Sequence, residues 1–451
     1  MNPKADARAR WSWMIFDWAA QPWNTLVITF IFGPYFVSTV APDPVTGQTI
    51  WAWATGAAGL AIALAAPVLG AAADATGPRK PWIAAFGVFY VAGALGLWWA
   101  APNAGAVPIA VAAFIVGLIG SEFAAVFANA MLPDLVEREG MGRLSGNGWA
   151  MGYAGGVASL IIMLALFAEN AQGTTLIGIA PILGLDAAAR EGTRFVGPVT
   201  AAWFVVFAAP LFLYVPDAPR RGSARGAVAR GLAELRGSLG DMRQRPSLSW
   251  FLGASMIYRD GLNGFYAFGG IYAAGVLGWS IVQIGVFGIL AAAIGALGAW
   301  IGGRADDAFG PKRVVAACLW GLAAASLLGV SVSREAVLFL VPVAADSALP
   351  DIGFYIAGAL VGAFGGSLQA SSRTLLVRQA DEARMTAAFG LYALAGKATA
   401  FLAPLLIAAA TALSGSQQWG VAPIIALFLL GLAALIPVSP EGDAAMERSA
   451  A

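Results

Sequence analysis

Long apolar segments constrain the fold of this chain more than any other feature. A helix that crosses a bilayer needs about 20 consecutive apolar residues, and twelve such segments can be read along the 451 residues. Only 11% of the residues are charged, against about 25% in a typical soluble protein. We therefore expect an all-α polytopic membrane protein with twelve transmembrane helices. They are predicted near 12–40, 50–73, 81–101, 107–133, 146–168, 197–216, 248–275, 281–303, 313–332, 352–377, 386–412 and 418–438.

The placement of the basic residues predicts the orientation of these helices. An even number of spans puts both termini on one side of the membrane. With the N-terminus inside, the external loops contain only three basic residues, Arg190, Arg194 and Arg334, and most of the others fall in internal loops. This distribution follows the positive-inside rule. It predicts cytoplasmic N- and C-termini and a multi-pass protein of the cell inner membrane.

Two loop sequences repeat about half a chain apart. Residues 70–80 and 303–313 both read G-x-x-x-D-x-x-G-P followed by two basic residues, and Asp307 follows Asp74 by 307 − 74 = 233 positions. The pair Gly120-Ser121 similarly matches Gly366-Ser367. Internal repeats of this kind are typical of transporters built from two related halves. The predicted organisation is a six-helix bundle in 1–216, an arginine-rich cytoplasmic linker in 217–246 with an amphipathic helix around 227–243, a second six-helix bundle in 247–438 and a cytoplasmic tail in 439–451.

The repeated loop resembles the signature of the major facilitator superfamily, across nearly the whole chain. Three further motifs resemble the bacterial relatives of its vacuole-effluxer branch: Asp17-Trp18-Ala19-Ala20, Tyr258-Arg259-Asp260-Gly261, and Gly390-Leu391-Tyr392 with Gly396-Lys397-Ala398. The resemblance implies two halves that rock around a mid-membrane site, and the vacuolar members are implied to export amino acids. One motif departs from the branch, which often has Asn-Ser-Ala-Tyr where this chain has Ala20-Gln21-Pro22-Trp23. The departure falls on a helix expected to line the cavity, where it would affect the choice of substrate.

The repeated loop also supplies candidate gating residues. Its two carboxylates are placed to accept hydrogen bonds from the positive N-terminal end of a neighbouring helix, and its basic residues can pair with carboxylates on the cytoplasmic face. The alternative is that the loop only marks topology, with glycine and proline forming the turn and the basic residues anchoring to lipid headgroups. The predicted gating residues are Asp17, Asp74, Arg79, Lys80, Asp307, Lys312, Arg313 and Arg373.

Six charged residues fall inside the predicted helices. A charge at the bilayer centre costs a few kcal/mol or more, so each needs a partner or a cavity. Asp17 and Arg373 lie near helix ends, whereas Glu122, Arg259, Asp260 and Lys397 lie near the middle. The mid-helix residues are therefore candidates for substrate binding, with Lys397 a possible partner of Asp260. The alternative is a set of static ion pairs that fix helix packing.

Polar and aromatic residues on the same helices complete the predicted site. Their types suit a small polar or zwitterionic solute, with a carboxylate on Arg or Lys and an amine on Asp or Glu. Since the chain has no histidine, proton coupling would rest on Glu122 and Asp260. The predicted substrate- and proton-binding residues are Gln21, Asn24, Glu122, Asn129, Tyr258, Arg259, Asp260, Asn263, Gln369, Tyr392 and Lys397.

Several functional classes are disfavoured by the sequence. No phosphate-binding loop follows a strand, the net charge of +1 offers nothing to nucleic acid, and the single cysteine excludes an internal disulfide. We expect no enzymatic activity, no catalytic residues, no metal site and no cofactor. The prediction is a monomeric, proton-coupled secondary transporter of a small organic solute, with an amino acid and export favoured. The alternatives are a lipid, amphiphile or drug exporter of the same fold, and a membrane scaffold or sensor that does not transport.

Overall fold

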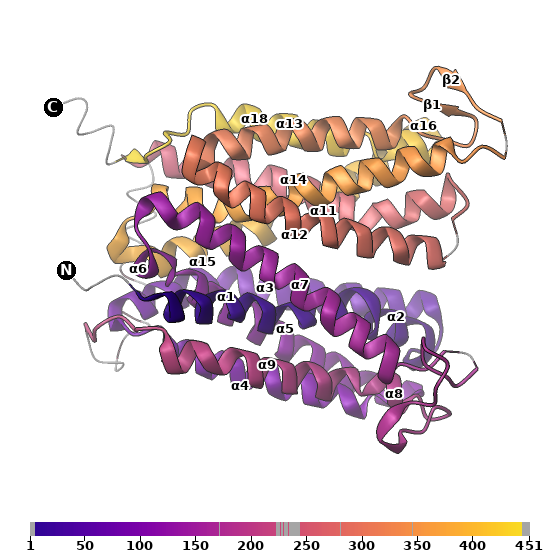
Figure 1. The fold of residues 1–451 in the computed structure, drawn as a ribbon, viewed down its shortest axis with the longest axis horizontal. Helices are drawn as coiled ribbons and strands as arrows, with labels where there is room; N and C mark the ends of the chain where they lie inside the picture. The colour runs from indigo at the N-terminus through magenta and orange to yellow at the C-terminus, as the bar shows by residue number, and fades with distance from the viewer. Residues whose placement is uncertain are drawn as a thin grey trace. The chain divides into compact units, whose positions relative to one another are not determined.

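The computed structural model of this chain is built almost entirely from helices (Figure 1). It describes residues 5–170, 172–221, 226, 229, 233, 244–279, 281–344 and 346–443, and within them every side chain except those of residues 44, 45, 48, 49, 52, 274, 281, 282 and 397. Most of the predicted amphipathic helix at 227–243 lies outside these residues. The chain divides into two units, each described by itself below. Unit 1 is Met1–Val136 with Met151–Leu232, and unit 2 is Glu137–Ala150 with Ala233–Ala451.

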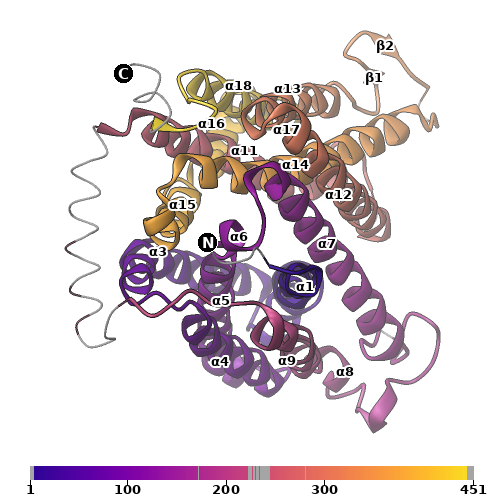
Figure 2. The ribbon, with the colours of Figure 1, turned by 60° about the vertical axis from the view of Figure 1, so that its left-hand side comes forward.

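Unit 1 is a bundle in which α4 packs against both α5 and α9, and α1 packs against α9 (Figure 2). Its first span is α1 (Ala7–Pro22), η1 (Trp23–Phe30), α2 (Phe32–Tyr35) and η2 (Phe36–Val40). The other long helices are α3 (Pro44–Thr76), α4 (Lys80–Gly96), α5 (Val107–Asn129), α7 (Met141–Leu166) and α9 (Val196–Tyr214). Short elements join them: η3 (Leu97–Trp99), η4 (Ala104–Ala106), α6 (Leu132–Leu135), η6 (Ile182–Gly184) and α8 (Glu191–Arg194).

Unit 2 is centred on α14, which packs against α12 and α13. The unit also includes Glu137–Ala150, that is η5 (Arg138–Gly140) and the beginning of α7, which we call the α7 start. Its long helices are α11 (Pro246–Gly275), α12 (Ile281–Phe309), α13 (Pro311–Val330), α14 (Leu349–Gln379), α15 (Met385–Ala398), α16 (Leu402–Ser414) and α18 (Pro423–Leu435). The short elements are β1 (Ala336–Val337), β2 (Val341–Pro342), η8 (Glu382–Arg384) and α17 (Gln417–Gly420).

Ten helices in the described residues are long and apolar enough to cross a membrane. The predicted segments 248–275 and 386–412 are not among them. The first corresponds to α11, which is 30 residues long but carries Arg259 and Asp260. The second is interrupted. The all-α membrane class is confirmed, and the count of twelve spans and the orientation of the termini remain predictions.

The prediction of one continuous helix over 386–412 is wrong at residues 399–401, where α15 ends and α16 begins. Pro404 lies in the first turn of α16, a position where the missing N–H of proline costs no helical hydrogen bond. The Asp260 carboxylate accepts a 2.7 Å hydrogen bond from the N–H of Ala403 and so caps the new helix. A side chain from α11 therefore stabilises the break.

Two other boundaries differ from the predictions. The first span is not a continuous α-helix, because the backbone changes to a π-helix at Trp23, directly after Pro22; proline lacks the N–H that an α-helical turn would use there. The segment between α13 and α14 forms an antiparallel hairpin of β1 and β2 instead of a plain loop.

Glycines set the closest helix contacts in both units. A Cβ on Gly120 of α5 would lie 2.3 Å from the backbone N of Tyr90 in α4, and a Cβ on Gly366 of α14 would lie 2.3 Å from the carbonyl O of Gly295 in α12. Small residues let membrane helices approach backbone to backbone. The repeated Gly-Ser pairs therefore both lie at close helix contacts, but with different neighbours: α4, which follows the repeated loop, in unit 1 and α12, which precedes it, in unit 2.

We predict that Gly366→Ala destabilises the protein, because the new methyl group must displace the α12 backbone. Overpacking of this kind costs about 1–3 kcal/mol. The measurement is thermal unfolding of the purified protein in detergent, followed by tryptophan fluorescence. Gly285→Ala is the matched control, since it lies in α12 with no atom near its Cβ position. Equal melting temperatures for the two variants would contradict the packing argument.

Candidate functional site

The repeated motif in unit 1 forms a buried charge cluster. Asp74 lies in the last turn of α3, and Arg79 immediately precedes α4; each is only 6% exposed. The Arg79 guanidinium lies 3.9 Å from the Asp74 carboxylate and also pairs with Asp134 after α5. One cation thus joins the ends of three elements of this unit.

The cap of α4 comes from a residue that the sequence analysis missed. The backbone N–H groups of Arg79 and Lys80 donate to the Asp217 carboxylate at 2.8 and 3.0 Å. The Lys80 ammonium donates to the carbonyl O of Phe212 at 2.9 Å. A carboxylate at a helix N-terminus satisfies unpaired N–H groups and favours the helix dipole. Asp217, three residues after α9, therefore ties the end of α9 to the start of α4.

The motif copy in unit 2 has different partners. Asp307, in the last turns of α12, accepts a 3.2 Å hydrogen bond from the N–H of Arg143, and its carboxylate lies 3.3 Å from the Arg143 side chain. The Lys312 ammonium donates to the carbonyl O of Ile436, whereas Arg313 is exposed. Asp307 thus contacts the N-terminal end of a neighbouring helix, the α7 start.

Arg373 of α14 holds the same segment from a second side. It is 3% exposed, and its Nε and Nη2 donate to the Oγ and the carbonyl O of Ser145 at 2.8 and 2.6 Å. The Ser145 hydroxyl in turn donates to the carbonyl O of Ala370 at 2.8 Å. The guanidinium also lies 5.8 Å from the ring centre of Trp149. A buried cation satisfied in this way fixes both its own helix and its partner.

Glycines allow the α7 start to approach α12 so closely. A Cβ on Gly142 would lie 2.3 Å from the Cβ of Asp306, and a Cβ on Gly146 would lie 2.4 Å from the carbonyl O of Ala299. On the facing side, a Cβ on Gly303 would lie 2.4 Å from the carbonyl O of Gly142. Gly303 opens the repeated motif, so its conserved position in the repeat has a steric reason in unit 2.

The neighbouring charges Arg259 and Asp260 of α11 point to different helices. The Arg259 guanidinium lies 4.3 Å from the ring centre of Tyr392, donates to the Tyr392 carbonyl O at 2.8 Å and lies where a Cβ on Gly396 would be. Asp260 is 2% exposed and caps α16 through one oxygen, while its Oδ1 has no hydrogen-bond partner in the described part of the chain. The proposed pairing of Asp260 with Lys397 is untested, because the Lys397 side chain lies outside the described residues.

The remaining predicted residues of unit 2 are unequally exposed. Tyr258 is fully buried, and its hydroxyl lies 2.8 Å from the Ser372 hydroxyl, so it packs within the bundle in this conformation. Gln369 and Tyr392 are half-buried, and Asn263 is exposed. Arg259 and Tyr392 are therefore the pair that the structure brings together.

The predicted residues of unit 1 lie along three of its elements. Gln21, near the end of α1, packs against Gly156 of α7, and Asn24 is exposed in η1. Glu122 and Asn129 are half-buried on α5. Asp17 is half-buried on α1, and a Cβ on Gly152 would lie 3.6 Å from its Cβ.

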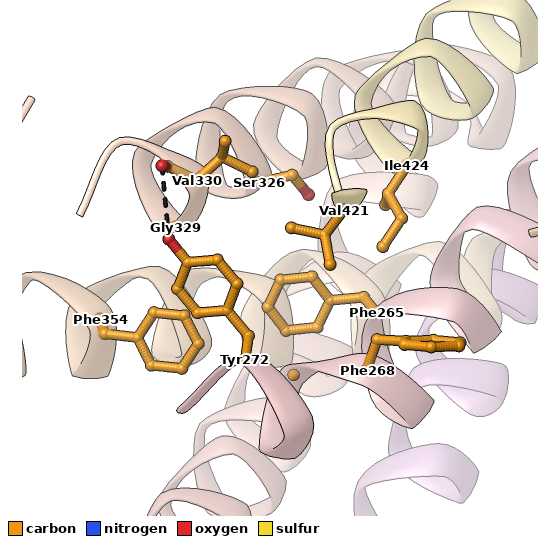
Figure 3. Close-up of a pocket in the computed structure, with 10 residues that line it drawn as sticks. Phe265, Phe268, Tyr272, Ser326, Gly329, Val330, Phe354, Val421 and Ile424 are labelled. Carbon is orange, nitrogen blue, oxygen red and sulfur yellow. Dashed lines mark hydrogen bonds between the residues drawn. The ribbon is translucent and has the colours of Figure 1, made fainter. Parts of the chain in front are cut away.

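A separate pocket in unit 2 is lined almost entirely by apolar side chains (Figure 3). It is a small hollow between α11, α13, α14 and the beginning of α18. None of the predicted substrate residues lines it, so the pocket and the charged residues are different candidate sites. Its lining is Phe265, Phe268, Gly269, Tyr272, Ser326, Gly329, Val330, Phe354, Val421 and Ile424.

Three functional candidates escaped the sequence analysis: Asp217, Ser145 and Asp306. Asp306 directly precedes the motif carboxylate Asp307 and is 1% exposed. The doublet of acids at the end of an apolar helix is the one signal that pointed to it. Ser145 and Asp217 carry no such signal, because their roles depend on which backbone groups the fold brings to them.

Comparisons with solved structures show the fold. The proton:xylose symporter XylE, solved with 6-bromo-6-deoxy-D-glucose, matches with a TM-score of 0.69 at 14% identity over 97% of both chains. The human organic anion transporter MFSD10 (TETRAN) matches with a TM-score of 0.68 at 18% identity over 95% of this chain and 99% of its own. XylE is a transporter of the major facilitator superfamily. At identities of 14% and 18%, both matches show only that this chain has the same fold.

Sequence comparisons show the family. An uncharacterized MFS-type transporter of Bacillus subtilis (strain 168), YxiO, is 25% identical over 457 residues, which span 97% of each chain. The model of the family described as "Vacuole effluxer Atg22 like" matches residues 48–444. With the match covering most of the sequence and the fold agreeing along its length, this chain belongs to the vacuole effluxer Atg22-like family of major facilitator transporters.

Proposed function

We propose that the protein is a secondary active transporter that moves a small organic solute by alternating access. The observation that carries this proposal is the attachment of the α7 start in unit 2. Arg373 and Asp307 hold it through hydrogen bonds and an ion pair, while α7 continues at Met151 into unit 1. A helix shared by two units and held by breakable polar contacts is suited to a gate.

The substrate class follows from Arg259. Its guanidinium is half-buried and stacked on Tyr392, and in the described residues it makes one hydrogen bond, through Nη1. The other N–H groups leave a fork that matches a carboxylate. A solute with a carboxylate, such as an amino acid, fits this arrangement and the family description of an effluxer; the organic anion transporter with the same fold points the same way.

Direction, coupling and location belong to the same proposal. Export is favoured by the family description, and proton coupling by the proton symporter of the same fold. Asp260, with one buried oxygen that has no described partner, and Glu122 are the candidate carboxylates for the proton. The protein is proposed to act as a monomer in the cell inner membrane, with the motif loops on the cytoplasmic side.

A second candidate function is export of a lipid or another amphiphile. The pocket of Figure 3 motivates it, because its lining of Phe265, Phe268 and Tyr272 offers an apolar surface to such a ligand. A ligand screen separates the two functions, since an amphiphile does not need the Arg259 fork.

We predict that a carboxylate-bearing ligand stabilises the wild-type protein and that Arg259→Gln weakens its binding by about tenfold to a hundredfold. Losing hydrogen bonds to a charged group costs about 1.5–3 kcal/mol. The measurement is a thermal-shift screen of amino acids and organic acids on purified protein, followed by titration of each hit and of its primary amide. Arg220→Gln, which removes an exposed guanidinium, is the matched control. Equal affinity for the acid and its amide would rule out Arg259 as the anchor.

We also predict that Arg373→Gln releases the α7 start. In a Cys318→Ala background, Leu144→Cys places a thiol at a position of the α7 start that is 5% exposed and leaves Ser145 intact, and its alkylation by a hydrophilic maleimide reports how often the segment opens. Loss of the hydrogen bonds from Arg373 to Ser145 should raise the alkylation rate about tenfold or more, since 1.4 kcal/mol corresponds to a factor of ten.

Arg10→Gln, at an exposed arginine of α1, serves as the control for charge and should leave the rate unchanged. An equal rate in the Arg373 variant and in its parent would show that the segment is not held by this side chain.

A further inference from the structure

Asp306 of α12 is a buried carboxylate with no cation paired to it in the described residues. It is 1% exposed, and neither of its oxygens has a hydrogen-bond partner in the described residues. The hydroxyls of Ser371 and Thr374, one turn apart on α14, lie beside it. Ser371 is 0% exposed and its hydroxyl also has no partner, whereas Thr374 donates to the carbonyl O of Ala370 at 3.2 Å. The polar groups that face the carboxylate on α14 are therefore two neutral hydroxyls, and neither supplies a positive charge.

The charged and titratable groups around Asp306 do not neutralise it. Asp307, the next residue, repels it, and Cys318 of α13 is a buried free cysteine. The neighbouring cations are already engaged elsewhere: Arg143 of the α7 start pairs with Asp307 at 3.3 Å, and Arg378 of α14 pairs with Glu441 at 2.8 Å. Arg373, which lies between Ser371 and Thr374 on α14, donates to Ser145. No ion pair to Asp306 is formed within the part of the chain that the structure describes.

A bare carboxylate at such a position is strongly unfavourable. Burying an unpaired charge costs several kcal/mol, and buried polar groups without partners are rare in native proteins. The cost disappears when a positive charge binds to the carboxylate. The two small cations that fit a site made of a carboxylate and a hydroxyl are a proton and Na⁺, since hard cations bind oxygen ligands.

We propose that Asp306 binds one monovalent cation, a proton or Na⁺, between α12 and α14, with the Ser371 hydroxyl as the neighbouring oxygen. This site is distinct from Glu122 and Asp260, which were nominated for coupling above. It is also distinct from Asp307, whose carboxylate is engaged by Arg143.

The α7 start covers this site. Gly142 approaches so closely that a Cβ on it would lie 2.3 Å from the Cβ of Asp306, and the adjacent Arg143 holds Asp307. A bound cation would therefore be enclosed while the segment is attached and would be released when it detaches. This coupling rests on the proposed gate, whereas the binding of the cation does not.

The test is thermal unfolding of the purified full-length protein in detergent, with two arms. One arm titrates NaCl against choline chloride at constant pH and ionic strength. The other varies pH from 6 to 9 in a buffer without Na⁺. A cation bound only in the folded state raises the melting temperature by mass action. We expect a shift on the order of 2–4 °C in one arm: a rise with Na⁺, or a fall as pH rises if the cation is a proton.

Asp306→Asn should abolish this response while leaving the protein folded, because the amide is neutral and nearly the same size. Ser371→Ala keeps the carboxylate and should weaken the response about tenfold in Na⁺ concentration, or move its midpoint by about one pH unit, a change of about 1.4 kcal/mol. Asp346→Asn, which removes an exposed carboxylate of unit 2, should behave as wild type.

Two results would overturn the site: a wild-type protein that responds to neither cation, or an Asp306→Asn variant that responds as strongly as wild type. Failure of transport with the Asp306 response intact would instead count against the proposed function alone.

Discussion

The cost of placing charge inside an apolar helix bundle organises this structure. In the described residues, buried charges are matched with groups on another element: Arg373 with Ser145 and Asp260 with the N–H of Ala403. The half-buried Arg259 is likewise matched with Tyr392. A charge inside the membrane cannot be hydrated, so it must pair with a polar group of the protein. Here that group lies on a helix that is distant in sequence. Asp306 is the exception, and that exception is what makes it a candidate for binding a cation.

Close backbone contact makes these matches possible. Glycines on both the α7 start and α12 bring the two backbones within reach, and the polar groups of Arg373 and Asp307 then attach the segment at two points. The glycines thus provide the close packing on which the polar contacts of Arg373 and Asp307 depend.

The repeated motif shows how one sequence pattern can do two jobs. In unit 1 its arginine, Arg79, pairs with Asp74 of the motif and with Asp134, and Asp217 caps the helix α4 that follows. In unit 2 its carboxylate reaches the α7 start instead. The motif sets the turn and the charged residues. The elements packed beside it determine whether these residues pair within unit 1, as Arg79 does, or contact the α7 start, as Asp307 does.

The sequence alone determined the all-α membrane class and most helix positions, because these depend on the length of apolar segments and on lipid as the solvent. It also showed the repeated loop, from which two related halves were predicted. The roles of Asp217, Ser145 and Asp306, the break at residues 399–401 and the grouping of the α7 start with unit 2 were decided only by the tertiary structure. Each depends on which backbone or side-chain group another helix brings alongside. The local sequence does not identify that neighbouring group. It therefore cannot distinguish a carboxylate that caps a helix, such as Asp217, from one with no paired cation, such as Asp306.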